Sequence, residues 1–165
     1  MMLKTPFIVP LLLALPAAVV LAPSAAPEAT IKALYIADAR SILGAGEGVM
    51  GSRAAREKFF SRAALKALND DEKAAEKRGE PPTIEGDPFI DAEDPDFADL
   101  NISRLSVDDQ TASVAAEFAR PSEKVREKIT YSLIFERGQW RINDMVWDRA
   151  HGAGETLRGL LKGAK

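Results

Sequence analysis

Residues 124–146, KVREKITYSLIFERGQWRINDMV, decide the fold. In their first half, apolar residues recur mostly at every second position, with polar residues between them, which is typical of a strand with one buried face. That apolar set is Val125, Ile129, Tyr131, Leu133 and Phe135. Arg137 and Gly138 then fit a tight turn, and Trp140, Ile142, Met145 and Val146 indicate a last strand. The stretch therefore predicts an antiparallel hairpin.

Upstream of the hairpin, two more strands are indicated. Residues 100–107 and 111–118 are separated by the polar triplet 108–110, which predicts a turn. In the second of these strands, Ala112, Val114, Ala116 and Phe118 alternate with polar residues. We therefore expect a four-stranded antiparallel sheet with one buried face.

Helical patterns flank the strands. Residues 28–43 place Ile31, Leu34, Tyr35 and Ile42 at mostly helical spacing, and Asp38 interrupts this stripe. After a glycine-rich connection, residues 54–78 are rich in Ala, Lys, Glu and Arg and predict one helix that ends at Gly79. A short helix is expected over 155–161. The fold class is α+β, with two N-terminal helices packed on one face of the sheet.

The N-terminus has the order of a secretory signal peptide. Lys4 precedes an apolar run over 6–22, and small residues follow it. We expect residues 1–26 to be the leader, with cleavage between Ala22 and Pro27, and residues 27–165 to form a single α+β domain in the periplasm. An uncleaved anchor is the alternative. The chain has no cysteine, which excludes a lipoprotein acylation site and a disulfide.

The composition limits the kinds of partner that the protein is expected to bind. A formal net charge of −3 argues against a nucleic-acid partner, because such binding depends on clustered Lys and Arg that neutralise phosphates. We expect no stable membrane anchor once the leader is cleaved.

Three segments together resemble a bacterial exported family, domain of unknown function 3828. They are 59–94 (FFSRAALKALNDDEKAAEKRGEPPTIEGDPFIDAED), 138–147 (GQWRINDMVW) and 154–163 (GETLRGLLKG). The resemblance implies a curved sheet wrapped against helices, similar to cystatins and to the nuclear transport factor 2 superfamily. It implies no established activity.

The segment from residue 80 to residue 100 is acidic and contains no base. Its carboxylates are Glu80, Glu85, Asp87, Asp91, Glu93, Asp94, Asp96 and Asp99. Clustered carboxylates can bind calcium, but these lack the alternate spacing and the central glycine of a calcium loop. We expect a flexible surface loop with no metal, so that calcium leaves the melting temperature unchanged.

The candidate binding residues are aromatic residues with polar groups and acids near the expected concave face. They are Tyr35, Asp87, Phe89, Tyr131, Trp140, Asp144 and Trp147. Asp87 precedes Pro88 and so fits a turn, and Phe89 would anchor that turn in the core.

No catalytic residue, metal ligand set or cofactor is predicted. His151 is the only histidine, and no Gly-x-Ser-x-Gly motif surrounds a serine. In the superfamily that this fold resembles, some enzymes use an Asp as a base and a Tyr to stabilise an enolate. By that resemblance, Asp144 is the candidate for the base.

These observations favour a periplasmic binding or protein-interaction module for a small apolar molecule or an unknown envelope protein. The alternative is a small pocket enzyme of the isomerase or dehydratase type, and a third reading is an immunity or inhibitor protein for a secreted toxin. A deep pocket with Asp144 near Tyr35 or Tyr131 would favour the enzyme. A shallow groove packed shut by Trp140 and Trp147 would favour the module.

Overall fold

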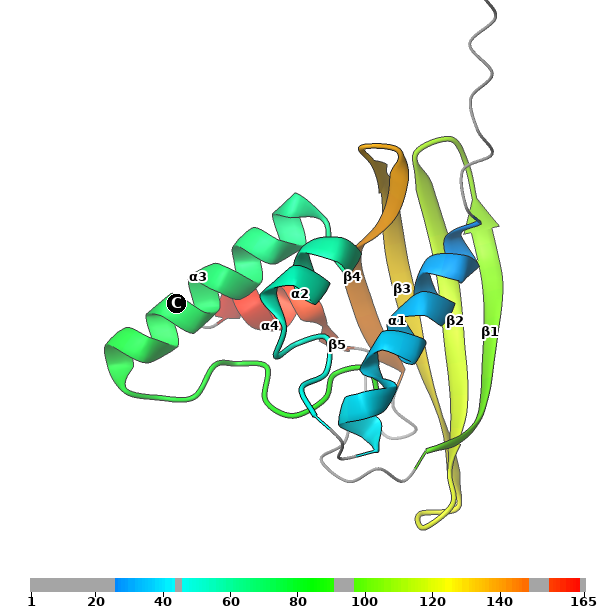
Figure 1. Ribbon diagram of the computed structural model, residues 1–165, viewed down its shortest axis with the longest axis horizontal. Coiled ribbons are helices and arrows are strands. Elements are labelled where there is room, and N and C mark those ends of the chain that lie inside the picture. The colour runs from blue at the N-terminus through cyan, green and yellow to red at the C-terminus, as the bar shows by residue number, and fades with distance from the viewer. Residues whose placement is uncertain (1–25, 44–45, 91–96, 149–154, 164–165) are drawn as a thin grey trace, which may run out of the picture.

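The computed structural model describes residues 26–43, 46–90, 97–148 and 155–163. Within these ranges the chain is α+β, and its strands form one antiparallel sheet in the order β1-β2-β3-β4-β5 (Figure 1). The strands are β1 (Ala98–Val107), β2 (Thr111–Arg120), β3 (Val125–Glu136), β4 (Gln139–Asp148) and β5 (Glu155–Thr156). The helices are α1 (Pro27–Ile42), α2 (Arg53–Phe59), α3 (Arg62–Arg78) and α4 (Leu157–Gly163). None of these helices is long and apolar enough to cross a bilayer.

The three central strands confirm the predicted meander and its buried face. Tyr131 on β3 stands opposite Val114 on β2 and Met145 on β4, and all three have no exposed surface. Leu133, the next residue on that face, is 1% exposed. Since side chains alternate across a strand, this register fixes which residues of β3 face the core.

The predicted turn between β3 and β4 is also confirmed. Glu136 pairs with Gln139, so Arg137 and Gly138 alone form the loop. Their φ angles are +54° and +78°. Two successive positive φ angles define a type I′ turn, whose twist matches that of the flanking strands.

The prediction of four strands is wrong, because the sheet has a fifth. Glu155 and Thr156 pair with Trp147 and Val146, so the predicted helix over 155–161 begins two residues later, as α4. Side chains hold this junction. The Asp144 carboxylate accepts a hydrogen bond from the Arg158 amide at 3.0 Å, and the Thr156 hydroxyl accepts one from the Gly159 amide at 2.9 Å. These bonds satisfy amides at the start of a helix that have no partner within it.

The single helix predicted over 54–78 is wrong as well. The chain leaves the helical conformation at Phe60, and the Ser61 amide donates to the Ile142 carbonyl at 2.8 Å. The Ser61 hydroxyl then caps α3 by accepting from the Ala64 amide at 3.1 Å. A helix interrupted to pair with a strand cannot be read from local composition. The predicted end at Gly79 is confirmed, with Gly79 at φ +68°.

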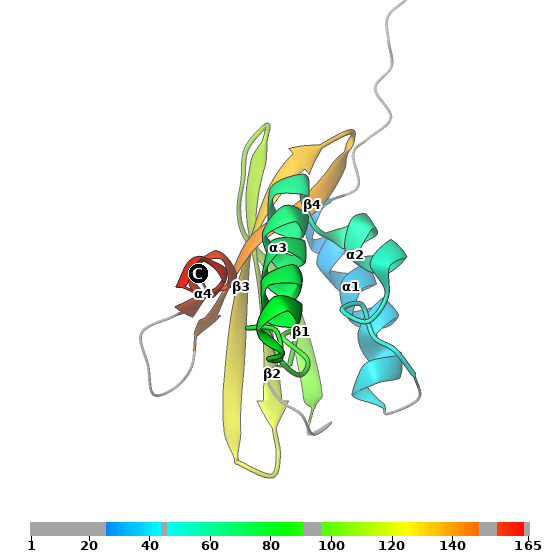
Figure 2. The same ribbon diagram turned by 90° about the vertical axis from the view of Figure 1, so that its left-hand side faces the viewer.

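The helices are not distributed equally over the two sides of the sheet. Figures 1 and 2 together show α1 and α2 on one side of the strands and α4 on the other side, with α3 between them. α1 covers the face that carries Tyr131 and buries Ile31, Leu34 and Tyr35 against it. The prediction of two N-terminal helical segments on one face is therefore confirmed for α1, the predicted helix over 28–43.

Candidate functional site

Five of the seven predicted binding residues meet around residues 87–90, in the connection between α3 and β1. These are Tyr35, Asp87, Phe89, Tyr131 and Trp147. Phe89 is fully buried and Ile90 is 3% exposed. The prediction that Phe89 anchors this turn in the core is confirmed, and the prediction that the acidic loop lies on the surface is wrong for residues 88–90. Residues 91–96 of that loop lie outside the described residues.

The turn expected at Asp87 is confirmed. The Asp87 carboxylate accepts a hydrogen bond from the Phe89 amide at 2.9 Å. On the other side, the indole nitrogen of Trp147 donates to the Pro88 carbonyl at 2.8 Å. The segment is thus held by its own side chain and by β4, which directs the Phe89 ring inward to lie 6.2 Å from that of Phe60.

Two tyrosines connect α1 and β3 to this segment. The Tyr35 hydroxyl donates to the Phe89 carbonyl at 2.8 Å, and its oxygen lies 3.1 Å from that of Tyr131. Because the Tyr35 hydrogen goes to the carbonyl, Tyr131 is the donor between the two hydroxyls. Burial is the main cause that raises the pKa of both hydroxyls well above the usual value. Both therefore stay neutral and act as fixed hydrogen-bond donors.

A pair of carboxyl groups lies beside the tyrosines. Asp38 on α1 is 1% exposed, and its carboxyl group lies close enough to that of Asp87 to interact with it. Oδ2 of each carboxyl is buried and has no hydrogen-bond partner among the described residues. Two ionised carboxylates cannot donate to each other, whereas a protonated Asp87 carboxyl can donate to a neighbouring carboxylate oxygen. Burial first, and then the bond with Asp38, raises the pKa of Asp87 to about 7.

Asp38 was not among the predicted site residues. The signal was its position, because residue 38 follows 31, 34 and 35 on the buried face of α1. A charged residue at such a position needs a partner. Besides Asp87, that partner is the Val49 amide, which donates to Asp38 Oδ1 at 2.6 Å. The carboxyl pair therefore also fixes the chain just after the glycine-rich connection.

An open groove lies above this cluster, between α1 and β1. We call it the α1–β1 groove; it has a volume of about 440 Å³. It is lined by Lys32, Tyr35, Ile36, Ala39, Leu43, Phe97, Leu100 and Ile102. The Tyr35 ring forms part of its wall and stacks on Phe97, with centroids 5.8 Å apart. Tyr35 thus contributes its ring to the groove and its hydroxyl to the buried cluster.

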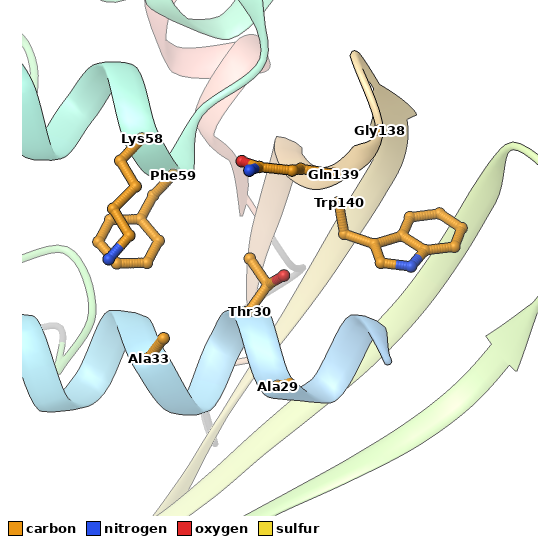
Figure 3. A pocket seen from close by; sticks show the side chains of 8 residues that line it. All are labelled: Ala29, Thr30, Ala33, Lys58, Phe59, Gly138, Gln139 and Trp140. Atoms are coloured by element: carbon orange, nitrogen blue, oxygen red, sulfur yellow. The ribbon is translucent and has the colours of Figure 1, made fainter. Parts of the chain in front are cut away.

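A second cavity, of about 250 Å³, lies beside α1 (Figure 3). The start of α1, the end of α2 and the β3–β4 turn surround it. Trp140 lines this cavity and packs edge-on against Phe135, and no hydrogen bond or ring contact joins it to the described residues around 87–90. Lys58 borders it and lies 5.0 Å from the Phe59 ring centroid.

Asp144 lies apart from the tyrosines. It stands opposite Ser132, whereas the adjacent pair, Met145 and Tyr131, points to the α1 face. Successive side chains of a strand point to opposite faces, so Asp144 faces away from Tyr131. There its carboxylate caps α4.

The described residues of this cluster form no metal site. Among the described residues no group of three or more metal-binding side chains is found. His151 lies outside the described residues. Comparisons of the chain with protein-family models, with curated proteins and with solved structures give no match. The resemblance to domain of unknown function 3828 therefore stays a prediction.

Proposed function

We propose that the protein is an exported binding module that holds a small apolar molecule in the α1–β1 groove. The observation that supports this proposal is the exposure of Ile36 and Leu43. They are 77% and 76% exposed, next to the buried ring of Tyr35. Large apolar side chains grouped around a hollow mark binding sites more often than single exposed ones do. A volume of about 440 Å³ is within the range of small-molecule sites, roughly 300–1,000 Å³.

The periplasm is the proposed location. Its support is the leader pattern of Lys4 followed by the apolar run over 6–22. A binding module in that compartment needs no cofactor, and the proposed ligand site consists only of side chains of the mature chain.

The proposed fold family is cystatin-like, as the resemblance to domain of unknown function 3828 implies. Its support is the order of elements, in which a long helix precedes an antiparallel meander and covers one of its faces. In this arrangement, the groove lies where α1 meets the free edge strand β1.

Three features favour a binding module over an isomerase or dehydratase. The Tyr35 hydroxyl is occupied by the Phe89 carbonyl, and the groove is lined by neither Asp38 nor Asp87. Asp144 faces the opposite side of the sheet. An acid–base enzyme requires its base within hydrogen-bond reach of a bound substrate, and this groove offers an apolar surface instead.

Titration with the apolar dye Nile red tests the proposal. Ile36 and Leu43 are exposed, so the double variant Ile36→Gln, Leu43→Gln should keep its melting temperature. It should bind the dye at least about ten-fold more weakly, because each apolar side chain contributes about 1 kcal/mol or more when a ligand covers it. Leu105→Gln is the control, because Leu105 is 54% exposed on β1 but does not line the groove. Failure of the wild-type protein to bind the dye, or an equal loss in the control, would contradict the proposal.

A further inference from the structure

The α1–β1 groove is polar at one end and apolar along the rest. Four of its lining residues, Lys32, Tyr35, Ile36 and Ala39, follow one face of α1, and Leu43 continues this line just after the helix. At a rise of 1.5 Å per residue, this line is about 16 Å long. Among the described residues, Lys32 is the one charged residue of the lining. An elongated molecule in the groove would therefore meet a cation at one end only.

The charges around Lys32 do not cancel it. One turn earlier on α1, Glu28 lies 3.5 Å from the guanidinium of Arg104, which follows the lining residue Ile102 on β1. The opposite charges of Glu28 and Arg104 therefore offset each other. Lys32 makes no ion pair with any described residue. The net charge of these three groups is positive, which is complementary to an anion.

We infer that the occupant of the groove is a fatty acid. Its acyl chain lies along Tyr35, Ile36 and Leu43, and its carboxylate lies beside Lys32. This inference rests on the proposed function and adds the chemical class of the ligand. Burying the chain supplies most of the affinity, and the partly exposed charge pair orients the molecule in the groove.

Size favours a free single-chain molecule over a protein surface. A stable protein interface buries about 1,200–2,000 Å² in total. Of the large apolar residues, Ile36, Leu43 and Leu100 are the exposed ones that line the groove. A single acyl chain, in contrast, needs only a narrow apolar groove such as the α1–β1 groove.

The test compares molecules of one chain length with different head groups. Laurate, dodecanol and dodecylamine are titrated into the mature protein by calorimetry below their aggregation limits. We expect laurate to bind about two- to five-fold more tightly than dodecanol, as one partly exposed ion pair allows, and dodecylamine to bind more weakly than either. Lys32→Met keeps the length of the side chain and removes its charge, so it should make laurate and dodecanol equal.

Lys58→Met is the matched control, because Lys58 borders the second cavity and not the groove. It should leave the preference for laurate unchanged. The inference is overturned if Lys58→Met abolishes that preference, if dodecanol binds as tightly as laurate, or if the protein binds anionic vesicles of phosphatidylglycerol but not free laurate. Nile red binding with no preference for laurate would refute only the ligand class. Absence of Nile red binding would refute the proposed function itself.

Discussion

The hydroxyl oxygens of Tyr35 and Tyr131 lie 3.1 Å apart, although 96 residues separate them in the chain. One residue comes from α1 and the other from the middle of β3. Because the Tyr35 hydroxyl also donates to the Phe89 carbonyl, this contact joins a helix, the sheet and a connecting segment at a single point. Residues that hold three elements together in this way stabilise the fold beneath the groove.

The two tyrosines should differ in their effect on stability. Tyr35→Phe leaves the buried Phe89 carbonyl and the Tyr131 hydroxyl without a partner, and should lower the free energy of unfolding by about 3 kcal/mol. Tyr131→Phe removes only the bond to Tyr35, and should cost about 1 kcal/mol. Urea denaturation of both variants measures the difference. Equal losses, or a larger loss for Tyr131→Phe, would mean that the Phe89 carbonyl does not depend on Tyr35.

The register of β3 makes a sharper stability prediction. Leu133 is 1% exposed and faces α1, whereas its neighbour Ser132 is exposed on the other face. Leu133→Asp buries an unpaired carboxylate, which costs several kcal/mol against a total stability of roughly 5–15 kcal/mol. We expect it to unfold the protein, as circular dichroism would detect. Ser132→Lys introduces a charge at the neighbouring exposed position, opposite Asp144 on β4, and should melt close to the wild type; if both variants melted alike, the assigned faces would be wrong.

Export can be checked on the natural product. The leader pattern predicts that the mature chain starts between Pro23 and Glu28 and is recovered in the soluble periplasmic fraction. N-terminal sequencing and fractionation measure both. A membrane-bound product that keeps residues 1–22 would instead identify an uncleaved anchor.

The sequence was sufficient to predict the meander, because alternation on 111–118 and 124–135 reports one buried face directly. The Arg137–Gly138 turn was also predictable, because tight hairpin turns favour glycine. The break between α2 and α3 was not predictable, since its cause is a bond from Ser61 to Ile142, 81 residues away. β5 was missed because a pairing of two residues carries no periodic signal.

The candidate site was predicted in part for a related reason. Aromatic residues with polar groups indicated Tyr35, Tyr131 and Trp147, which do meet near Phe89. Asp38 was noticed as a charge in an apolar stripe, but its partner could not be identified. That partner is 49 residues further along the chain and lies in a loop, where no periodicity places it.

The carboxyl pair gives the protein a defined pH dependence. The pKa of Asp87 is raised from its ordinary value of 3.8 to about 7, first by burial and then by the bond with Asp38. Between these two values the folded protein holds a proton that the unfolded chain has released. Unfolding then releases a proton, so the contribution of this group to stability is complete below about pH 4. It is lost as the pH rises toward 7, and it changes little above that.

Asp87→Asn tests this dependence, because the amide can donate to Asp38 without titrating and can still accept from the Phe89 amide through its carbonyl. Urea denaturation between pH 5 and pH 8 should show stability falling with pH in the wild type and a flatter profile in the variant, which should be the more stable protein at pH 8. Asp108→Asn is the matched control, since it removes one charge from an exposed carboxylate whose pKa is lowered by its bonds to Thr111. That group titrates below this window, so its variant should keep the slope of the wild type. An unchanged slope in Asp87→Asn would show that the proton does not reside on the Asp38–Asp87 pair.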